Sequence, residues 1–228
     1  GAIDWSMRSF HGYSTSRGSS YNAYLILDEK ITLIDTVKEP FAQEMLDRIA
    51  AVIDPARIDY IISNHVEPDH SGSLPILLQR CPNAKVFTSL PNGQKGLTAR
   101  YGDLPYEGVK TGAALSLGKR TLQFVATPML HWPDSMVTYC PEENILFSND
   151  AFGQHLAANQ RFDDENDLAL LMQEAKKYYA NILMLYGKQA QTALKALAAL
   201  PIDIIAVGHG ILWRSHIPEI LAAYQQWS

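Results

Sequence analysis

The part of the sequence best suited to chemistry is a run of metal-ligand side chains within residues 65–70. Two imidazoles and two carboxylates fall in these six positions, namely His65, Glu67, Asp69 and His70. A solvated acidic loop with incidental histidines is the alternative, but four such side chains in so short a span are typical of a metal site. The mixture of nitrogen and oxygen ligands favours iron, manganese or zinc over copper(I) or calcium.

The spacing of these side chains predicts a loop and not a helix. On a helix, positions four apart share a face, which would pair His65 with Asp69 and leave Glu67 outside. Pro68, in the middle of the run, also argues against a helix. A tight loop can instead direct alternate side chains toward two separate metal ions.

The elements around this run place it at the edge of a sheet. The β-branched and aromatic residues 59–62 predict a buried strand directly before it. Residues 73–80 predict a helix after it, with Ser71 or Ser73 available as the cap. The ligands would therefore lie at the carboxyl end of a strand, where open α/β folds place their sites.

Three further ligand candidates follow predicted strands in the second half of the chain. They are His131 after the strand 121–126, Asp150 after the strand 145–148, and His209 after the strand 203–207. A lone histidine is more often a structural residue than a ligand. Because all three occupy equivalent positions after strands, we expect them to converge with the first run on one edge of the fold.

The remaining pattern predicts one domain with α/β architecture in four layers, helix, sheet, sheet, helix. Hairpins are predicted over 21–35 and 137–148, a further strand over 85–88, and helices over 40–53, 91–100, 167–183, 189–200 and 218–227. Each half of the chain then has a hairpin, helices, and a later strand that ends at a histidine-bearing loop. No fixed-period repeat is present.

Composition excludes several classes of protein. The 228 residues carry 19% charged side chains and a net charge of −5, without a basic block, so no nucleic-acid partner is expected. No apolar run is long enough to span a membrane, and no signal peptide is expected. The only cysteines, Cys81 and Cys140, are not in a CxxC pair, which indicates a cytoplasmic protein without disulfides.

The assembled motif resembles the metallo-β-lactamase superfamily, whose hydrolases usually carry histidine where this chain has Glu67. The glutamate variant resembles the flavodiiron proteins, or A-type flavoproteins, which include rubredoxin:oxygen oxidoreductases and nitric oxide reductases. The segments that carry this resemblance are 65–70 (HVEPDH), 131–136 (HWPDSM), 149–155 (NDAFGQH) and 208–210 (GHG). The similarity extends from residues 10–12 (FHG) to 213–214 (WR), nearly the whole chain.

The resemblance implies a metallo-β-lactamase-like αββα sandwich over residues 1–228 with two iron ions. One iron would be held by His65, Glu67 and His131, the other by Asp69, His70 and His209, with Asp150 bridging them. His11 and a tyrosine, Tyr179 or its neighbour Tyr178, are the implied donors of a hydrogen bond or proton to bound oxygen species. His155 and His216 are expected to be structural or exposed.

The resemblance also implies an activity, the reduction of O2 to water, of NO to N2O, or of both. In the family the electrons come from FMN in a flavodoxin-like domain, supplied by rubredoxin or a similar donor, and a head-to-tail homodimer brings FMN to the diiron site of the partner. This chain offers no glycine-rich phosphate loop for FMN, so the flavodoxin-like domain is expected to be absent from it.

Two other functions compete with this one. A binuclear zinc hydrolase of the same superfamily would act on a thioester or lactam through metal-activated water, and Glu67 argues against it. A non-catalytic module would use its metal only for structure, and the complete set of ligand positions argues against that.

Overall fold

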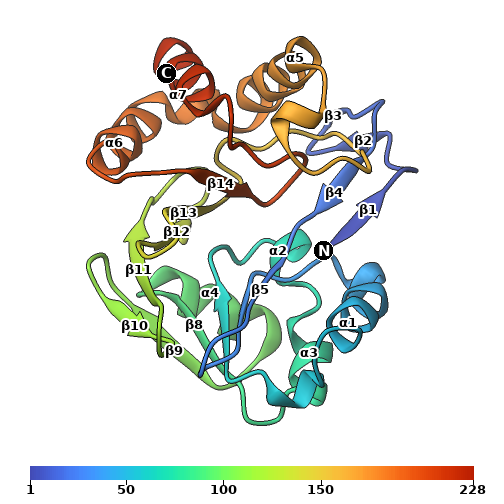
Figure 1. The fold of residues 1–228 in the computed structure, drawn as a ribbon, viewed down its shortest axis with the longest axis vertical. Coiled ribbons are helices and arrows are strands. Elements are labelled where there is room, and N and C mark those ends of the chain that lie inside the picture. The colour runs from blue at the N-terminus through green and yellow to red at the C-terminus, as the bar shows by residue number, and fades with distance from the viewer.

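The computed structural model describes all of residues 1–228, and two five-stranded sheets form its centre (Figure 1). The first sheet has the order β5-β6-β7-β8-β9, formed by Tyr24–Ile26, Thr32–Ile34, Tyr60–Ser63, Lys85–Ser89 and Tyr106–Val109. Strands β5 and β6 are an antiparallel hairpin, and β6 to β9 run parallel. The hairpin predicted over 21–35 is therefore confirmed, with a shorter first strand.

The second sheet is mainly antiparallel. Its order is β10-β11-β12-β13-β14, formed by Ala114–Ser116, Thr121–Ala126, Met136–Cys140, Ile145–Asn149 and Ile204–Val207. The last pair, β13 and β14, is parallel, and β11 runs in the same direction because two antiparallel steps separate it from β13. The carboxyl ends of β11, β13 and β14 consequently lie at one edge of the sheet.

Helices cover the outer face of each sheet (Figure 1). They are α1 (Ala42–Ala50), α3 (Leu74–Arg80), α4 (Asn92–Tyr101), α5 (Leu168–Tyr178), α6 (Gly187–Leu197) and α7 (Ile217–Trp227), and the short helix α2 (Pro68–Ser71) lies apart from them, between the two halves. Helices α1, α3 and α4 share a hydrophobic core with the first sheet, and α5, α6 and α7 share one with the second. No helix combines the length and the apolar character that crossing a membrane requires.

Shorter elements complete the chain. Strand β1 (Ala2–Asp4) pairs with β4 (Ser19–Tyr21), and β2 (Ser9–Phe10) pairs with β3 (Tyr13–Ser14). Single turns of 3-10 helix span Glu39–Phe41, Pro55–Arg57, Asp163–Glu165 and Met184–Tyr186, and a π-helical turn spans Tyr179–Leu183.

Neighbouring residues of the central strands face different layers, which is what makes the sandwich. Ile61 contributes to the core under α1 and α3, whereas Ile62 lies in the layer between the sheets. Leu146 and Phe147 divide in the same way on the other sheet. The predicted αββα, metallo-β-lactamase-like fold is confirmed.

Several local predictions need correction. The helix predicted over 167–183 ends at Tyr178, because the next turn is π-helical and the backbone no longer repeats every 3.6 residues. Neither serine caps α3: Ser73 Oγ donates to Val37 O at 2.6 Å, and Ser71 Oγ donates to Val66 O at 2.7 Å. Strands β9 and β10 were not predicted.

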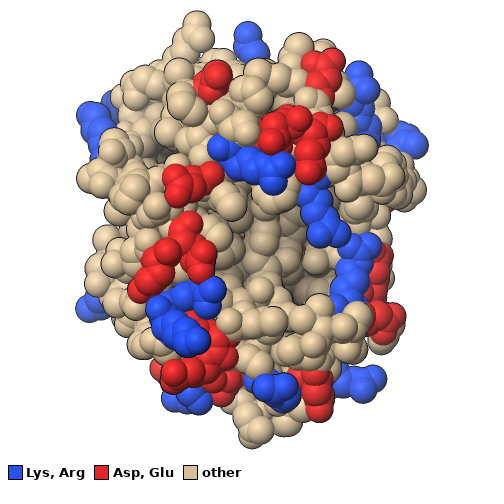
Figure 2. Space-filling view, in the orientation of Figure 1, with Lys and Arg blue, Asp and Glu red and all other residues tan.

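On the face shown in Figure 2, basic and acidic side chains are interspersed around a central hollow. A groove of about 880 Å³ is lined by residues of both halves of the molecule, with Leu33, Met45 and Ile211 among its apolar lining residues. None of the predicted metal ligands lines this groove. The candidate site is therefore elsewhere, at the edge where the strands end.

The layer between the sheets provides a test of the fold. Phe124 is 1% exposed within this layer, so Phe124→Ala is expected to lower the free energy of unfolding by about 3–5 kcal/mol, because it leaves a cavity. Leu185 is 88% exposed, and Leu185→Ala should change the free energy by less than about 0.5 kcal/mol. Denaturant unfolding measures both, and equal losses would contradict the layer assignment.

Candidate metal centre

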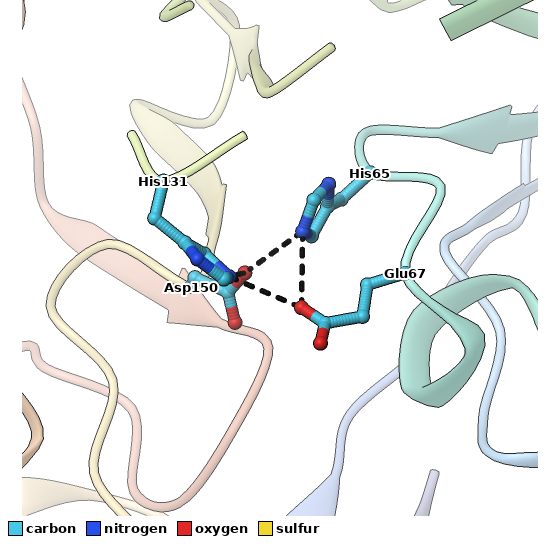
Figure 3. A group of neighbouring side chains, drawn as sticks. All are labelled: His65, Glu67, His131 and Asp150. Atoms are coloured by element: carbon cyan, nitrogen blue, oxygen red, sulfur yellow. Dashed lines mark hydrogen bonds and ion pairs between the residues drawn. The ribbon is translucent and has the colours of Figure 1, made fainter. Parts of the chain in front are cut away.

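Seven side chains meet in two adjoining groups at the edge of the sandwich. The first group consists of His65, Glu67, His131 and Asp150, and the second of Asp69, His70 and His209. In each group the possible ligand atoms lie within 4.8 Å of one another. Figure 3 shows His65 and Glu67 reaching the first group from one side, with His131 and Asp150 opposite them. The structure brings the predicted ligand loops together.

The first group is arranged around a common point. The Oε2 atom of Glu67 lies 3.3 Å from His65 Nε2 and 3.1 Å from His131 Nε2. The Oδ2 atom of Asp150 lies 3.5 Å from each of these two nitrogens. Two imidazole nitrogens and two carboxylate oxygens therefore face one another, a donor set that suits iron or zinc.

The second group shares Asp150 with the first. The Oδ1 atom of Asp150 lies 3.0 Å from His70 Nε2 and 3.5 Å from His209 Nε2. Asp69 Oδ2 lies 3.0 Å from His209 Nε2 and 3.6 Å from His70 Nε2. Asp150 thus presents one oxygen to each group, which is the geometry of a bridging carboxylate.

Unpaired buried atoms show that these residues fit metal ions. Both carboxylate oxygens of Asp69, Oδ2 of Asp150 and Nε2 of His209 are buried without a hydrogen-bond partner. Asp69 Oδ2 and His209 Nε2 lie 3.0 Å apart, yet neither has a hydrogen-bond partner. Leaving such atoms unpaired costs about 1–3 kcal/mol each, and a cation between them would remove that cost.

The second group depends on a short helix that the sequence analysis excluded. Helix α2 begins at Pro68, with Glu67 as the residue before it, and presents Asp69 and His70 from one turn. The prediction of a loop holds for residues 65–67 but was wrong from Pro68 onward. A proline at the first helical position lacks only an N–H that would have no partner there in any case.

Hydrogen bonds on the far side of two imidazoles fix the nitrogen that faces the site. His209 Nδ1 donates to Ser20 O at 2.7 Å, and His65 Nδ1 donates to Asp134 Oδ2 at 2.8 Å. The lone pair of Nε2 is then directed into the site in both residues. The sequence analysis assigned no role to Asp134, although it lies within the segment 131–136 that carried the resemblance.

The two predicted hydrogen-bond donors have different positions. His11 Nε2 donates to Glu67 Oε1 at 2.8 Å, at the entrance of the site. Tyr178 OH donates to Asp150 Oδ1 at 2.7 Å and is fully buried. The structure does not bring Tyr179 into the site: its ring packs on Tyr224 and Trp227, with centroids 5.0 and 5.5 Å away. Tyr178 is therefore the tyrosine of this centre.

The other two histidines have separate surroundings. His155 is buried, its Nδ1 lies 2.7 Å from Ser19 Oγ, and its ring centroid is 4.9 Å from that of His209. His216 lies outside the site and its Nδ1 contacts Asp163 Oδ2 at 3.1 Å.

Ionisation in the metal-free site follows from burial and close opposite charges. Burial alone would raise the pKa of Glu67, but hydrogen bonds from His11 and His131 hold that pKa well below its usual value. Burial alone would lower the pKa of His70, but the carboxylates of Asp69 and Asp150 raise it to about 9. The pKa of His131 is likewise raised to about 9 against the effect of burial, by hydrogen bonds to Asp150 and Glu67. Without metal, protons therefore supply the missing positive charge.

Comparisons with known proteins agree with this geometry. The profile of the "ODP family beta lactamase" matches residues 20–210. A nitric oxide reductase of Moorella thermoacetica is 48% identical over the whole chain, and a rubredoxin-oxygen oxidoreductase of Megalodesulfovibrio gigas is 48% identical over 94% of it. The crystal structure of the flavodiiron protein from Giardia intestinalis superposes with a TM-score of 0.97 at 44% identity over 100% of the chain.

The chain spans only part of each of these proteins. It covers 58% of the Moorella protein, 54% of the Megalodesulfovibrio protein and 56% of the Giardia chain. The similarity to flavodiiron proteins predicted from the sequence is confirmed over this part.

The raised pKa values predict how the stability of the metal-free protein depends on pH. Because the pKa of His70 and of His131 is about 9 in the folded state and about 6.5 when unfolded, their stabilisation is complete below pH 6.5 and is lost as the pH rises through 9. The melting temperature of metal-free protein should therefore fall by about 5 °C or more between pH 6.5 and 9.5.

Calorimetry of chelator-treated protein measures this change. The metal-loaded protein is the control, and it should lose metal toward acid, since binding requires neutral imidazoles. A metal-free protein that becomes more stable from pH 6.5 to 9.5 would contradict the protonated cluster.

Proposed function

The chain belongs to the ODP family of β-lactamase-like proteins, and on this basis we propose that it is the diiron domain of an oxidoreductase that reduces O2 to water, NO to N2O, or both. The observation that carries the proposal is the pair of ligand groups joined by Asp150, with the carboxylate of Glu67 in the first group. The resemblance described from the sequence implies a histidine at this position in hydrolases of the superfamily. An anionic oxygen donor favours the ferric state more than a neutral imidazole does, which suits a site that gives up electrons.

The proposed ligands follow the two groups. His65, Glu67 and His131 would hold one iron, Asp69, His70 and His209 the other, and Asp150 would bridge them. Two ferrous ions held in this way supply two electrons and open positions for a diatomic molecule. Reduction of two NO to N2O and water consumes two electrons and two protons, whereas reduction of O2 to two waters consumes four of each.

The difference in exposure between the groups supports one direction of entry. The side chains of Glu67 and His131 are 12% and 10% exposed, whereas those of His70 and His209 are fully buried. The diatomic substrate and the incoming electrons would reach the site beside Glu67 and His131. His11 lies at this entrance, so its imidazole is placed to deliver a proton there.

Residues on the closed side would hold the bridging carboxylate in place. Tyr178 OH donates to the same Asp150 oxygen that faces His70. Burial raises the pKa of Tyr178 well above its usual value, so the phenol keeps its proton and remains a donor. Tyr178 thereby limits the rotation of Asp150 when substrate enters.

Electron supply is a further part of the proposal. The names of similar proteins include rubredoxin and nitric oxide, and the chain is similar to only part of them. We infer that FMN in a flavodoxin-like domain passes electrons to the site within a head-to-tail homodimer, with rubredoxin or a similar protein as donor. Free, buried Cys81 and Cys140 are consistent with a reducing cytoplasm.

Metal identity and reactivity test the function. Protein purified without added metal should contain two irons per chain, and anaerobically reduced protein should consume O2 or NO stoichiometrically. NADH alone should not sustain turnover, but added flavodoxin-like domain and reductase should. Zinc as the main metal, together with thioesterase or lactamase activity, would instead establish the binuclear hydrolase.

Removal of the bridge tests the assignment of Asp150. Asp150→Ala should lose more than one iron per chain, because its two oxygens face both groups. His209→Ala should mainly affect the second iron, and His216→Ala, which alters a histidine outside the site, should affect neither. Iron analysis by mass spectrometry measures all three variants, and full occupancy in Asp150→Ala would refute the bridge.

A further inference from the structure

One buried carboxylate, that of Asp35, connects loops from both sheets at the candidate metal centre. Its Oδ1 accepts the backbone N–H of Asn64 at 2.7 Å. Its Oδ2 accepts Nδ2 of Asn64 and Nδ2 of Asn149, each at 3.1 Å. Asp35 is 3% exposed, and none of its partners is a cation.

The two asparagines directly precede proposed ligands. Asn64 comes before His65 at the end of β7, and Asn149 comes before Asp150 at the end of β13. The carboxylate of Asp35 therefore joins the first sheet to the second at the positions where both deliver a ligand.

The same network reaches the second ligand group. Thr36, the next residue after Asp35, donates to His70 O from its backbone N at 2.9 Å and from Oγ1 at 2.7 Å. Asn149 O accepts the N–H of Gly208 at 2.6 Å, directly before His209. Four proposed ligands from both groups are thus held within two residues of this network.

The two oxygens of Asp35 determine how both amides are turned. Both oxygens accept hydrogen bonds here, so each asparagine points its NH2 group toward Asp35. The amide oxygens then face the other way, where Asn64 Oδ1 accepts from Thr138 Oγ1 at 2.7 Å and Asn149 Oδ1 accepts from the N–H of Asp150 at 2.9 Å.

The backbone at this point is also unusual. Asp35 has a φ of 55° and Asn149 a φ of 52°, in the left-handed region that residues other than glycine rarely adopt. The hydrogen bond between their side chains thus connects two residues that both have an uncommon backbone conformation. This is a feature expected where surrounding structure fixes a functional geometry.

We propose that Asp35 is a positioning residue that sets the spacing of the two ligand groups, by fixing the amides of Asn64 and Asn149. The inference rests on the proposed diiron function, because it assigns the ligands that Asp35 positions. Asp35 itself touches neither metal nor substrate.

Asp35→Asn tests the proposal with almost no change in size. In one amide orientation the new NH2 group would face the NH2 groups of Asn64 and Asn149, and in the other it would face the backbone N–H of Asn64. Either way a donor replaces an acceptor, so at least one ligand loop should shift. We expect about tenfold or greater weakening of metal binding, the lower end of the 10–100-fold range for supporting residues. Competition with a graded chelator measures the affinity, and the exchange coupling seen by EPR in the one-electron-reduced centre should change.

Asp163→Asn is the matched control. Asp163 is also a buried aspartate, and its carboxylate accepts backbone N–H groups of Arg214, Ser215 and His216, away from the ligands. Its replacement should lower the melting temperature but leave metal affinity and EPR coupling unchanged. If Asp35→Asn weakens metal binding no more than Asp163→Asn does, the positioning role is overturned.

A second variant keeps the test decisive if Asp35→Asn does not fold. Asn149→Gly removes the side chain with its amide, and glycine adopts the left-handed conformation of Asn149 readily. It should also weaken metal binding about tenfold, and wild-type affinity would overturn the proposal.

The two proposals fail in different ways. Two zinc ions in the wild-type protein would overturn the diiron function alone, and the same variants would then be compared with zinc. Two irons in the wild type, held equally tightly in all variants, would overturn only the role of Asp35.

Discussion

Three carboxylates buried within one small volume are the constraint on which this structure depends. Asp69 and Asp150 are each 2% exposed, and the side chain of Glu67, at the entrance, is 12% exposed. Burying an anion is costly unless positive charge compensates it. Four imidazoles can provide that charge as protons, or can direct a metal ion to provide it. The same side chains are therefore compatible with a metal-free and a metal-bound form of the site. Metal binding would replace the protons on the imidazoles with metal ions.

The sandwich satisfies this constraint by bringing strand ends from two sheets to one edge. His65 follows β7 of the first sheet, whereas Asp150 and His209 follow β13 and β14 of the second. Neither sheet alone carries a complete group, since Glu67 needs His131 from the opposite side. Strand β4, outside both sheets, contributes Ser20, whose carbonyl orients His209. The centre is consequently assembled only when the layer between the sheets has formed.

The sequence was sufficient to predict the convergence of the ligand loops, because alternating strand and helix patterns place the ends of strands at a common edge. It was not sufficient for interactions between distant residues. The hydrogen bonds of Asp35 with Asn64 and Asn149 join residues that are 29 and 114 positions apart in the sequence. No local sequence pattern predicts such bonds. Asp35 is the last residue of a predicted strand, and Asp150 follows another, so a position at a strand end was the available signal. Likewise, the choice between Tyr178 and Tyr179 depends on the rotation of α5, which a pattern of neighbouring tyrosines does not define.

The unequal burial of the two groups has a consequence for the handling of metal. A chelator or competing ion can approach the partly open first group directly, but the second group is enclosed by side chains with almost no solvent contact. Kinetic lability should therefore differ between the two positions even where their equilibrium affinities are alike. Such a difference would allow stepwise substitution, with the outer ion exchanged while the inner ion stays. A protein with two different metals in known positions could then be prepared, and each position could be studied by its own spectrum.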